Sequence, residues 1–247
     1  MKKLVFFLLL LCPFPLQAQI ARDATAQGPP DGNSGSGPIS WTHTTAGTNR
    51  FGLVVIAGDL NTGVDDVTAA DVTWGGAAVT LVAKNTATLN RFLYLFYIIA
   101  PATGSQTIAV ASKTHYLLGV SASYTGVAQV SPIDATATNQ GGPTILTLTT
   151  MLTTTVANDW TILAEDSYDG NAPPAAGTGS NLWISASMYG DPSFFDSMGT
   201  VSTGSVSMTT TRTNGSKIAH VMAAIKPNVA GPAGPPAGTL TVLGVGR

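Results

Sequence analysis

The stretch that most restricts the fold is an unbroken apolar run, Phe92–Ile99 (FLYLFYII), which ends before a proline. A run this short cannot cross a bilayer as a helix, and it is rich in aromatic and β-branched side chains. We therefore expect a central strand that is covered on both faces. The following PATGS segment predicts a turn, because proline fixes φ and Gly104 can take a positive φ. Two further strand-like segments, Gln106–Ala111 and Tyr116–Tyr124, complete a region that we expect to form the centre of the core.

The composition supports strands throughout. Charged residues make up only 10% of the chain, and Glu165 is the single glutamate among 13 acidic residues. Helix surfaces are normally built from Glu, Lys, Gln and Arg, whereas Thr, Val, Gly and Ala suit strands joined by tight turns. Strand-like segments recur at intervals of roughly 8–15 residues, as in sandwiches and jelly rolls. We predict an all-β fold, an antiparallel, jelly-roll-like β-sandwich of about twelve strands with flexible N- and C-terminal extensions.

The first 18 residues have the pattern of a signal peptide. A basic Lys2-Lys3 precedes the apolar stretch Leu4–Leu11, and small-residue cleavage is expected after Ala18. The mature protein is therefore expected to be secreted or held at the cell surface, without a membrane span. Residues 19–38 are rich in Gly, Pro and Ser and predict a flexible lead-in, which a short strand over Ile20–Thr25 could precede.

The remaining chain divides into three parts. Residues 39–227 are expected to form the β-sandwich domain, and residues 228–238 a stiff Gly/Pro linker. Residues 239–247 (TLTVLGVGR) form a strand-like tail. This tail could pair with an exposed sheet edge on the same or a neighbouring subunit, or the chain could be a fragment of a longer protein.

Several local patterns predict specific connections inside the domain. Gly75-Gly76 lies between two β-prone runs and predicts a hairpin. Gln140–Pro143 predicts a turn between two separate strands. Gly190–Gly199 is expected to be a loop into which Phe194 and Phe195 fold back.

Charge content excludes one class of function, and cysteine content excludes one kind of scaffold. Two of the 11 basic residues lie in the signal peptide, so the mature chain has nine basic and 13 acidic residues and a net charge of −4. No basic cluster is present, and nucleic-acid binding therefore has no electrostatic basis. The only cysteine, Cys12, lies in the signal peptide, so the mature domain has no disulfide framework.

No catalytic motif is recognisable, and we expect no enzymatic activity. His43, His115 and His220 are far apart and lack metal-ligand spacing, and a Gly-x-Ser-x-Gly elbow is absent. His220 lies in an apolar run, which favours a core histidine with satisfied hydrogen bonds. Glu165 and Asp166 are adjacent on a predicted strand, so their side chains should point to opposite faces instead of forming an acid/base pair.

One loop has the composition of a calcium site. Asp166, Asp169 and Asn171 supply oxygen donors around Gly170, as hard cations require. The spacing does not match the helix–loop–helix calcium motif, so an ordinary solvated loop is the competing interpretation. Calcium is the only cofactor that the sequence suggests.

A second candidate site could bind a glycan. Alternation places Trp183, Ser185, Ser187 and Tyr189 on one face of a predicted strand, and Tyr168 lies in the preceding loop. A planar ring beside hydrogen-bonding groups suits a sugar. The alternative is that these rings pack under the long loop.

Several segments between Ile39 and Pro227 occur together in an order that resembles a known group of domains. They are WTHT from Trp41, NRFGLVVI from Asn49, VTWGGAAVTLV from Val72, LFYIIAPATGS from Leu95 and SYTGV from Ser123. The arrangement resembles secreted bacterial and phage-associated β-sandwich domains that are comparable to concanavalin-type jelly rolls. The resemblance implies a module of surface, adhesive or appendage proteins, and it transfers no functional residue.

From these observations we expect a secreted, non-enzymatic surface or adhesive module, or a structural module of an appendage. The first alternative is a carbohydrate-binding module, assisted by calcium. The second is a polysaccharide-active enzyme without a recognisable motif. The expected partners are a glycan, or a neighbouring subunit bound through the C-terminal strand.

Overall fold

The computed structural model describes residues 19–28, 38–59, 67–86, 91–111, 113, 117–167, 174–185 and 192–229. These residues form strands β1 to β15 and one 3-10 turn, η1 (Ala69–Asp71), and they contain no α-helix. No helix in this described part of the chain is long and apolar enough to cross a membrane. The predicted all-β, antiparallel, sandwich-like fold is confirmed, with more strands than expected because several are very short.

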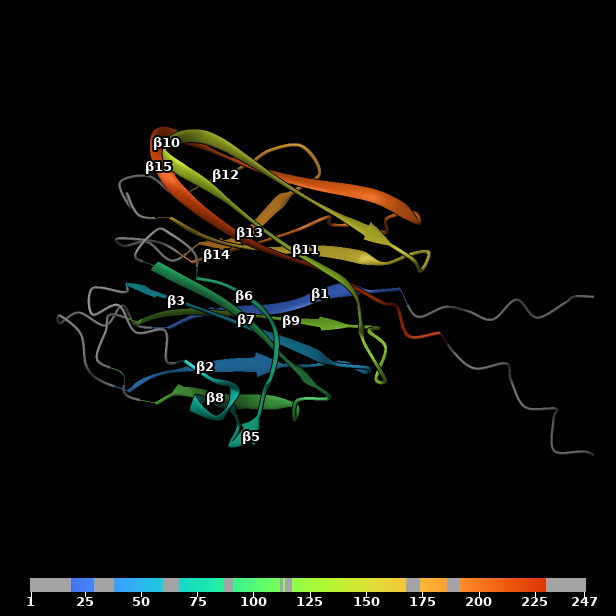
Figure 1. Ribbon diagram of the computed structural model, residues 1–247. Coiled ribbons are helices and arrows are strands. Elements are labelled where there is room, and N and C mark those ends of the chain that lie inside the picture. The colour runs from blue at the N-terminus through green and yellow to red at the C-terminus, as the bar shows by residue number, and fades with distance from the viewer. Residues whose placement is uncertain are drawn as a thin grey trace, which may run out of the picture.

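The strands stack in layers, which Figure 1 shows from the side. The lower sheet has the order β2 (Ile39–Thr45), β8 (Gly104–Val110), β4 (Val72–Trp74) and β5 (Ala77–Ala78). The middle sheet has the order β1 (Ala21–Gln27), β9 (Leu117–Thr125), β3 (Phe51–Asp59), β7 (Arg91–Ile99) and β6 (Thr80–Asn85). The upper sheet has the order β10 (Ile133–Thr154), β15 (Gly204–Ile225), β11 (Trp160–Ser167), β14 (Ser193–Asp196) and β13 (Asn181–Ser185), and β12 (Ala175–Ala176) also pairs with β15.

The middle sheet is apolar on both faces, as the Phe92–Ile99 run predicts. In β7, Leu93 and Leu95 pack toward the upper sheet, whereas Phe92 and Phe96 pack toward the lower sheet. All four side chains are buried. Burying a side chain of this size contributes about 1.5–3 kcal/mol, so the two interlayer cores supply much of the stability.

Close packing between the lower and middle sheets requires a small residue beneath a large one. The Trp74 ring lies on Gly52 of β3, where an added Cβ would be 2.8 Å from Trp74 Cζ3. The same tryptophan ends β4 and leads into the predicted Gly75-Gly76 hairpin. Both glycines take positive φ, 58° and 79°, which confirms the turn.

The upper sheet contains a long two-stranded ribbon that folds back on itself. β10 pairs with β15 from Ile133↔Ile225 to Thr154↔Gly204, so the predicted turn at Gln140–Pro143 is wrong. The register shifts between Gly141 and Thr147 instead, and the ribbon bends there, at the upper left of Figure 1.

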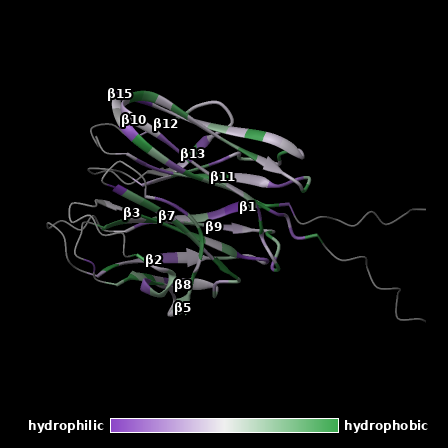
Figure 2. Cartoon of the chain, viewed as in Figure 1, coloured by the Kyte–Doolittle hydropathy of each residue, from purple (hydrophilic) through white to green (hydrophobic). Residues whose placement is uncertain are grey.

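We call the folded-back part, Ile145–Thr154 with Gly204–Thr211, the flap. Its Leu152 and Met208 pack on Leu163 of β11 and Met222 of β15, which adds a third apolar interlayer. In Figure 2 these strands show white bands, which are residues of intermediate hydropathy, between green bands, which are hydrophobic residues. This is the pattern expected where threonines and serines alternate with apolar residues along a strand.

Two segments next to irregular sequence form strands, one near the N-terminus and one in the C-terminal half. β1 belongs to the middle sheet and pairs with β9, so the short strand predicted over Ile20–Thr25 is present, over Ala21–Gln27. The predicted loop 190–199 contains β14, in which Phe194 and Phe195 are both fully buried. They fill different interlayers because successive strand residues point to opposite faces.

Candidate functional site

Most of the predicted ligand residues cannot be placed. Tyr168, Asp169, Asn171, Ser187 and Tyr189 lie outside the described residues. For Ser185 the backbone position in β13 is described, and its side chain is not. The structure therefore tests the positions of two predicted site residues only, Trp183 and Asp166.

Trp183 contributes to a cluster that joins the middle and upper layers. Arg22 of β1 donates to both oxygens of Asp196 of β14, at 2.7 and 2.8 Å. The Arg22 guanidinium lies 4.9 Å from the centre of the Trp183 ring, and the Tyr124 ring meets Trp183 edge-on at 4.9 Å. Tyr124 also donates its hydroxyl to Asp196 at 3.0 Å. Trp183 thus packs against neighbouring side chains, which is the alternative that the sequence left open.

Asp166 lies inside the fold and does not belong to a surface loop. It is 1% exposed, and its two oxygens accept from Arg91 Nε and Nη2 at 2.6 and 2.7 Å. The placement of Asp166 in an exposed calcium loop is therefore wrong, because β11 continues through Ser167. Among the residues that the structure describes, no group of three His, Cys, Asp or Glu could hold a metal ion. A calcium site at Asp169 and Asn171 stays a prediction.

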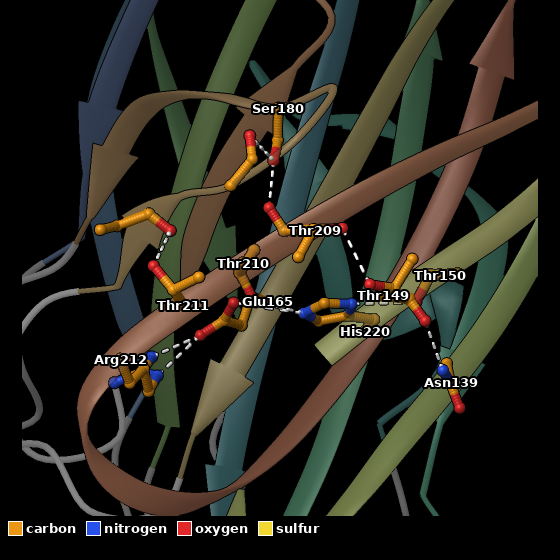
Figure 3. A network of polar contacts seen from close by, with 12 residues as sticks. Asn139, Thr149, Thr150, Glu165, Ser180, Thr209, Thr210, Thr211, Arg212 and His220 are labelled. Carbon is orange, nitrogen blue, oxygen red and sulfur yellow. Dashed lines mark hydrogen bonds and ion pairs between the residues drawn. The ribbon is translucent and has the colours of Figure 1, made fainter. Parts of the chain in front are cut away.

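Glu165 points to the opposite face of β11, as predicted for adjacent strand residues, and forms a second buried cluster (Figure 3). Glu165 Oε1 accepts from Arg212 Nε at 2.8 Å and from Nη2 at 2.6 Å. Glu165 Oε2 lies 3.2 Å from His220 Nε2, and the two imidazole nitrogens also lie 2.9 Å from the hydroxyls of Thr150 and Thr210. The core-histidine interpretation of His220 is confirmed.

This cluster occupies the interlayer between the upper sheet and the flap. Thr150, Thr210 and Arg212 come from or next to the flap, whereas Glu165 and His220 come from the sheet beneath it. Burial raises the pKa of Glu165, but the hydrogen bond and charge of His220 and the charge of Arg212 outweigh it, so the pKa lies below its usual value. The carboxylate is consequently charged at neutral pH and fixes the flap to the sheet electrostatically.

A third polar cluster lies between the lower and middle sheets. Trp41 Nε1 donates to Ser121 Oγ at 2.9 Å, and that oxygen lies 2.8 Å from His43 Nδ1. On the other side of the ring, His43 Nε2 lies 2.9 Å from Ser123 Oγ, which donates to Asp23 Oδ2 at 2.8 Å. Because Ser123 gives its one proton to Asp23, a neutral His43 donates from Nε2 to Ser123 and accepts at Nδ1 from Ser121, whose hydroxyl also lies 3.3 Å from the Ala26 carbonyl oxygen.

The His43 cluster contains the residue types of a hydrolase triad in a different arrangement. In a triad the histidine lies between the serine and the aspartate, whereas Ser123 here lies between His43 and Asp23. His43 is also 1% exposed, and burial lowers its pKa to about 4 against the opposing charge of Asp23. A buried neutral imidazole of this kind stabilises the fold and offers no nucleophile to a substrate.

Asp159 is a buried acid near a second acid, Asp134. Within the described residues neither oxygen of its side chain has a hydrogen-bond partner. Asp134 accepts from the amide and hydroxyl of Thr155, both at 2.6 Å. Burial and the neighbouring Asp134 carboxyl raise the pKa of Asp159 to about 7, and the charge of Lys226 opposes this. The Asp159 carboxyl therefore keeps its proton below neutral pH.

Replacement of Asp159 by Asn is expected to stabilise the protein above neutral pH. The unfolded carboxyl loses its proton near pH 4 and the folded one near pH 7, so wild-type stability from this group falls as pH rises between those values. An amide needs no such proton, and we expect a gain of roughly 4 kcal/mol at pH 7.5 that disappears at pH 4. Urea unfolding at both pH values measures this; an equal gain at pH 4 would contradict the raised pKa of Asp159.

The sequence patterns did not indicate the basic partners in these clusters. Arg22, Arg91 and Arg212 each pair with an acid far away in the chain. One signal was available for Arg91, because it directly precedes the apolar Phe92–Ile99 run in a chain with few charges. A charged side chain at the end of a buried strand needs a residue of opposite charge beside it, but the sequence does not show which acidic residue pairs with Arg91.

Comparison with known proteins adds no relative, since no family, no curated protein and no solved structure matches the chain.

Proposed function

We propose that this protein is a secreted, non-enzymatic surface module that acts through an exposed β face, as an adhesive or appendage component. The observation that carries the proposal is the contrast between buried and exposed polar groups. Glu165, Asp166, His43 and His220, the residues best suited to chemistry, are buried and hydrogen-bonded to neighbouring protein groups. The exposed face of the flap has hydroxyl groups and no charge.

The outer face of the flap is built from two facing rows of small side chains. The pairs are Thr147↔Thr211, Thr149↔Thr209, Met151↔Ser207 and Thr153↔Ser205. The β10 members are exposed and alternate with buried Leu148, Thr150, Leu152 and Thr154. Thr149 and Thr209 hydroxyls lie 2.8 Å apart, and cross-strand threonine pairs of this kind stabilise a sheet. An uncharged, flat surface of this kind suits contact with another surface more than capture of a small molecule.

The carbohydrate-binding alternative loses part of its basis. A sugar would stack on the face of Trp183, but the Arg22 guanidinium already lies over that ring. Tyr124 contacts the same ring edge-on. The remaining aromatic candidates, Tyr168 and Tyr189, lie outside the described residues.

The proposal is tested by locating the full chain and assaying it for activity. In a bacterial host that expresses the full gene, antibody should label the protein on intact cells or recover it from the medium. The purified protein should release no reducing sugar from a polysaccharide panel. Retention inside the cell would contradict the surface role. Hydrolysis that is lost in a folded Glu165→Gln variant would establish the enzyme alternative.

A further inference from the structure

The flap has an edge that no other described strand covers, although the Asn139 side chain donates to the carbonyl of Thr149 at 2.6 Å. β10 is the terminal strand of the upper sheet, and β15 is its only strand partner among the described residues. Leu146 and Met151 of this segment are 51% and 61% exposed. Residues 135–158 contain no charged side chain. Sheet edges are normally protected by charges, prolines or a covering element, and a long, uncharged edge is a template for another strand.

The chain leaves the domain beside this edge. A shallow groove of about 500 Å³ is lined by Val130, Val156 and Val229, together with Lys226 and its neighbours. Val156 follows the last residue of β10 by two positions, and Val229 is the last residue described. Val229 and the C-terminal end of β10 therefore lie at the same end of the domain.

The sequence beyond Val229 contains a segment whose alternating pattern suits the edge. In Thr239–Arg247, Thr239 and Thr241 alternate with Leu240 and Val242. The flap strand has the same alternation, with Thr147 and Thr149 outward and Leu148 inward. A tail strand added to the edge would continue the hydroxyl face on one side and the apolar interlayer on the other.

The tail could add to the edge of its own molecule or to the edge of a second copy. The length and stiffness of the linker distinguish these two arrangements. Gly231–Gly238 (GPAGPPAG) is rich in proline and favours an extended polyproline conformation. At about 3.1 Å per residue, an extended segment of this length reaches roughly 25 Å from its own exit. To pair antiparallel with its own β10, the tail would have to begin next to Val229. The extended linker therefore favours an edge on another molecule.

We propose that Thr239–Arg247 of one copy adds as a strand to the β10 edge, Ile145–Thr154, of a second copy. This inference rests on the proposed function as a surface module, and it identifies the binding partner as a second copy of the same chain. Each copy has one donor tail and one acceptor edge, so the contact is head-to-tail and extends into chains of subunits unless it closes into a ring.

Assembly of the mature chain tests the proposal. Light scattering after gel filtration, over a hundredfold range of concentration, should show species that grow from one subunit to several. Deletion of Thr239–Arg247 should leave a single subunit at every concentration. The matched control is Val242→Pro, which keeps the length and charge of the tail but cannot sustain a ladder strand, and should behave as the deletion does. An unchanged assembly state in both variants would overturn the proposal.

Cysteine pairs locate the contact, since the mature chain has no cysteine of its own. A Met151→Cys protein mixed with a Leu243→Cys protein should form a disulfide-linked dimer under mild oxidation. Val130→Cys, at an 82% exposed position outside the edge, should give at least tenfold less dimer with the same partner. An intramolecular disulfide in a single chain carrying both Met151→Cys and Leu243→Cys, at high dilution, would overturn the choice of a second copy.

The two proposals fail separately. A protein that is exported, catalytically inert and monomeric with or without its tail contradicts strand addition alone. A hydrolytic or intracellular protein contradicts the surface function, whatever its assembly state.

Discussion

Replacement of Glu165 by Ala is expected to lower the free energy of unfolding by about 3–5 kcal/mol. The Arg212 side chain is 2% exposed, and Glu165 Oε1 accepts two of its N–H groups. Without the carboxylate, a buried guanidinium and His220 lose the acceptor that holds the flap on the upper sheet. Urea unfolding followed by far-UV circular dichroism measures the loss.

Two further variants separate charge from packing. Glu165→Gln keeps the shape and one acceptor oxygen, and it should cost less than Glu165→Ala. The double variant Glu165→Leu/Arg212→Met removes both charges and should recover most of the loss, because burying an ion pair carries a large desolvation cost of its own. A loss below about 1 kcal/mol for Glu165→Ala would show that the cluster is not important for stability.

Between about pH 4 and pH 6.5 the protonation of His43 and that of Asp159 should change the free energy of unfolding in opposite directions as pH rises. A variant that lacks one of the two groups should reveal the effect of the other. His43 stays neutral in the folded protein down to about pH 4, whereas it binds a proton near pH 6.5 when unfolded. Its contribution to stability therefore rises with pH across that range, by about 1.4 kcal/mol per pH unit. Asp159 keeps its proton up to about pH 7 in the folded state, so its contribution falls with pH by a similar slope.

From pH 4.5 to pH 6 the contributions of His43 and Asp159 should accordingly cancel. In Asp159→Asn the His43 contribution is no longer offset, and stability relative to the wild type should rise by about 2 kcal/mol over that interval. In His43→Gln the Asp159 contribution is no longer offset, and stability relative to the wild type should fall by a similar amount. Burial also raises the pKa of Asp166, but that contribution is common to the wild type and both variants. Unfolding free energies at four pH values test both slopes. Parallel pH profiles for the wild type and both variants would show that neither group binds its proton as described.

Parts of the fold follow from short-range patterns in the sequence. The Phe92–Ile99 run predicts a strand buried on both faces, and β7 is such a strand. Apolar and polar residues alternate from Ile39 to His43, and β2 accordingly buries one face and exposes the other. The Gly75-Gly76 pair predicts a hairpin that is present. Each of these features is determined by residues that are close together along the chain, either through a turn or through the order of apolar and polar side chains.

The β10–β15 ribbon shows where such patterns fail. Gln140–Pro143 has turn-forming residues, yet β10 is paired with β15 on both sides of them, up to Gly141↔Ile218 and again from Ile145↔Ser216, so the ribbon bends there without ending the strand. Phe194 and Phe195 are preceded by a loop-like sequence, yet they form β14 because two interlayers require apolar side chains at that position. Tertiary packing overrides local turn propensity in both segments.

The sequence by itself determined the fold class, the apolar strands that form its centre and the opposite orientations of Glu165 and Asp166. Only the tertiary structure decided that Asp166 pairs with Arg91, that Glu165 pairs with Arg212, and that Arg22 crosses between layers to Asp196, 174 positions away. The reason is physical. Alternation along a strand requires only local geometry, whereas a buried charge selects its partner from whichever strands the stacking of layers brings within hydrogen-bond distance.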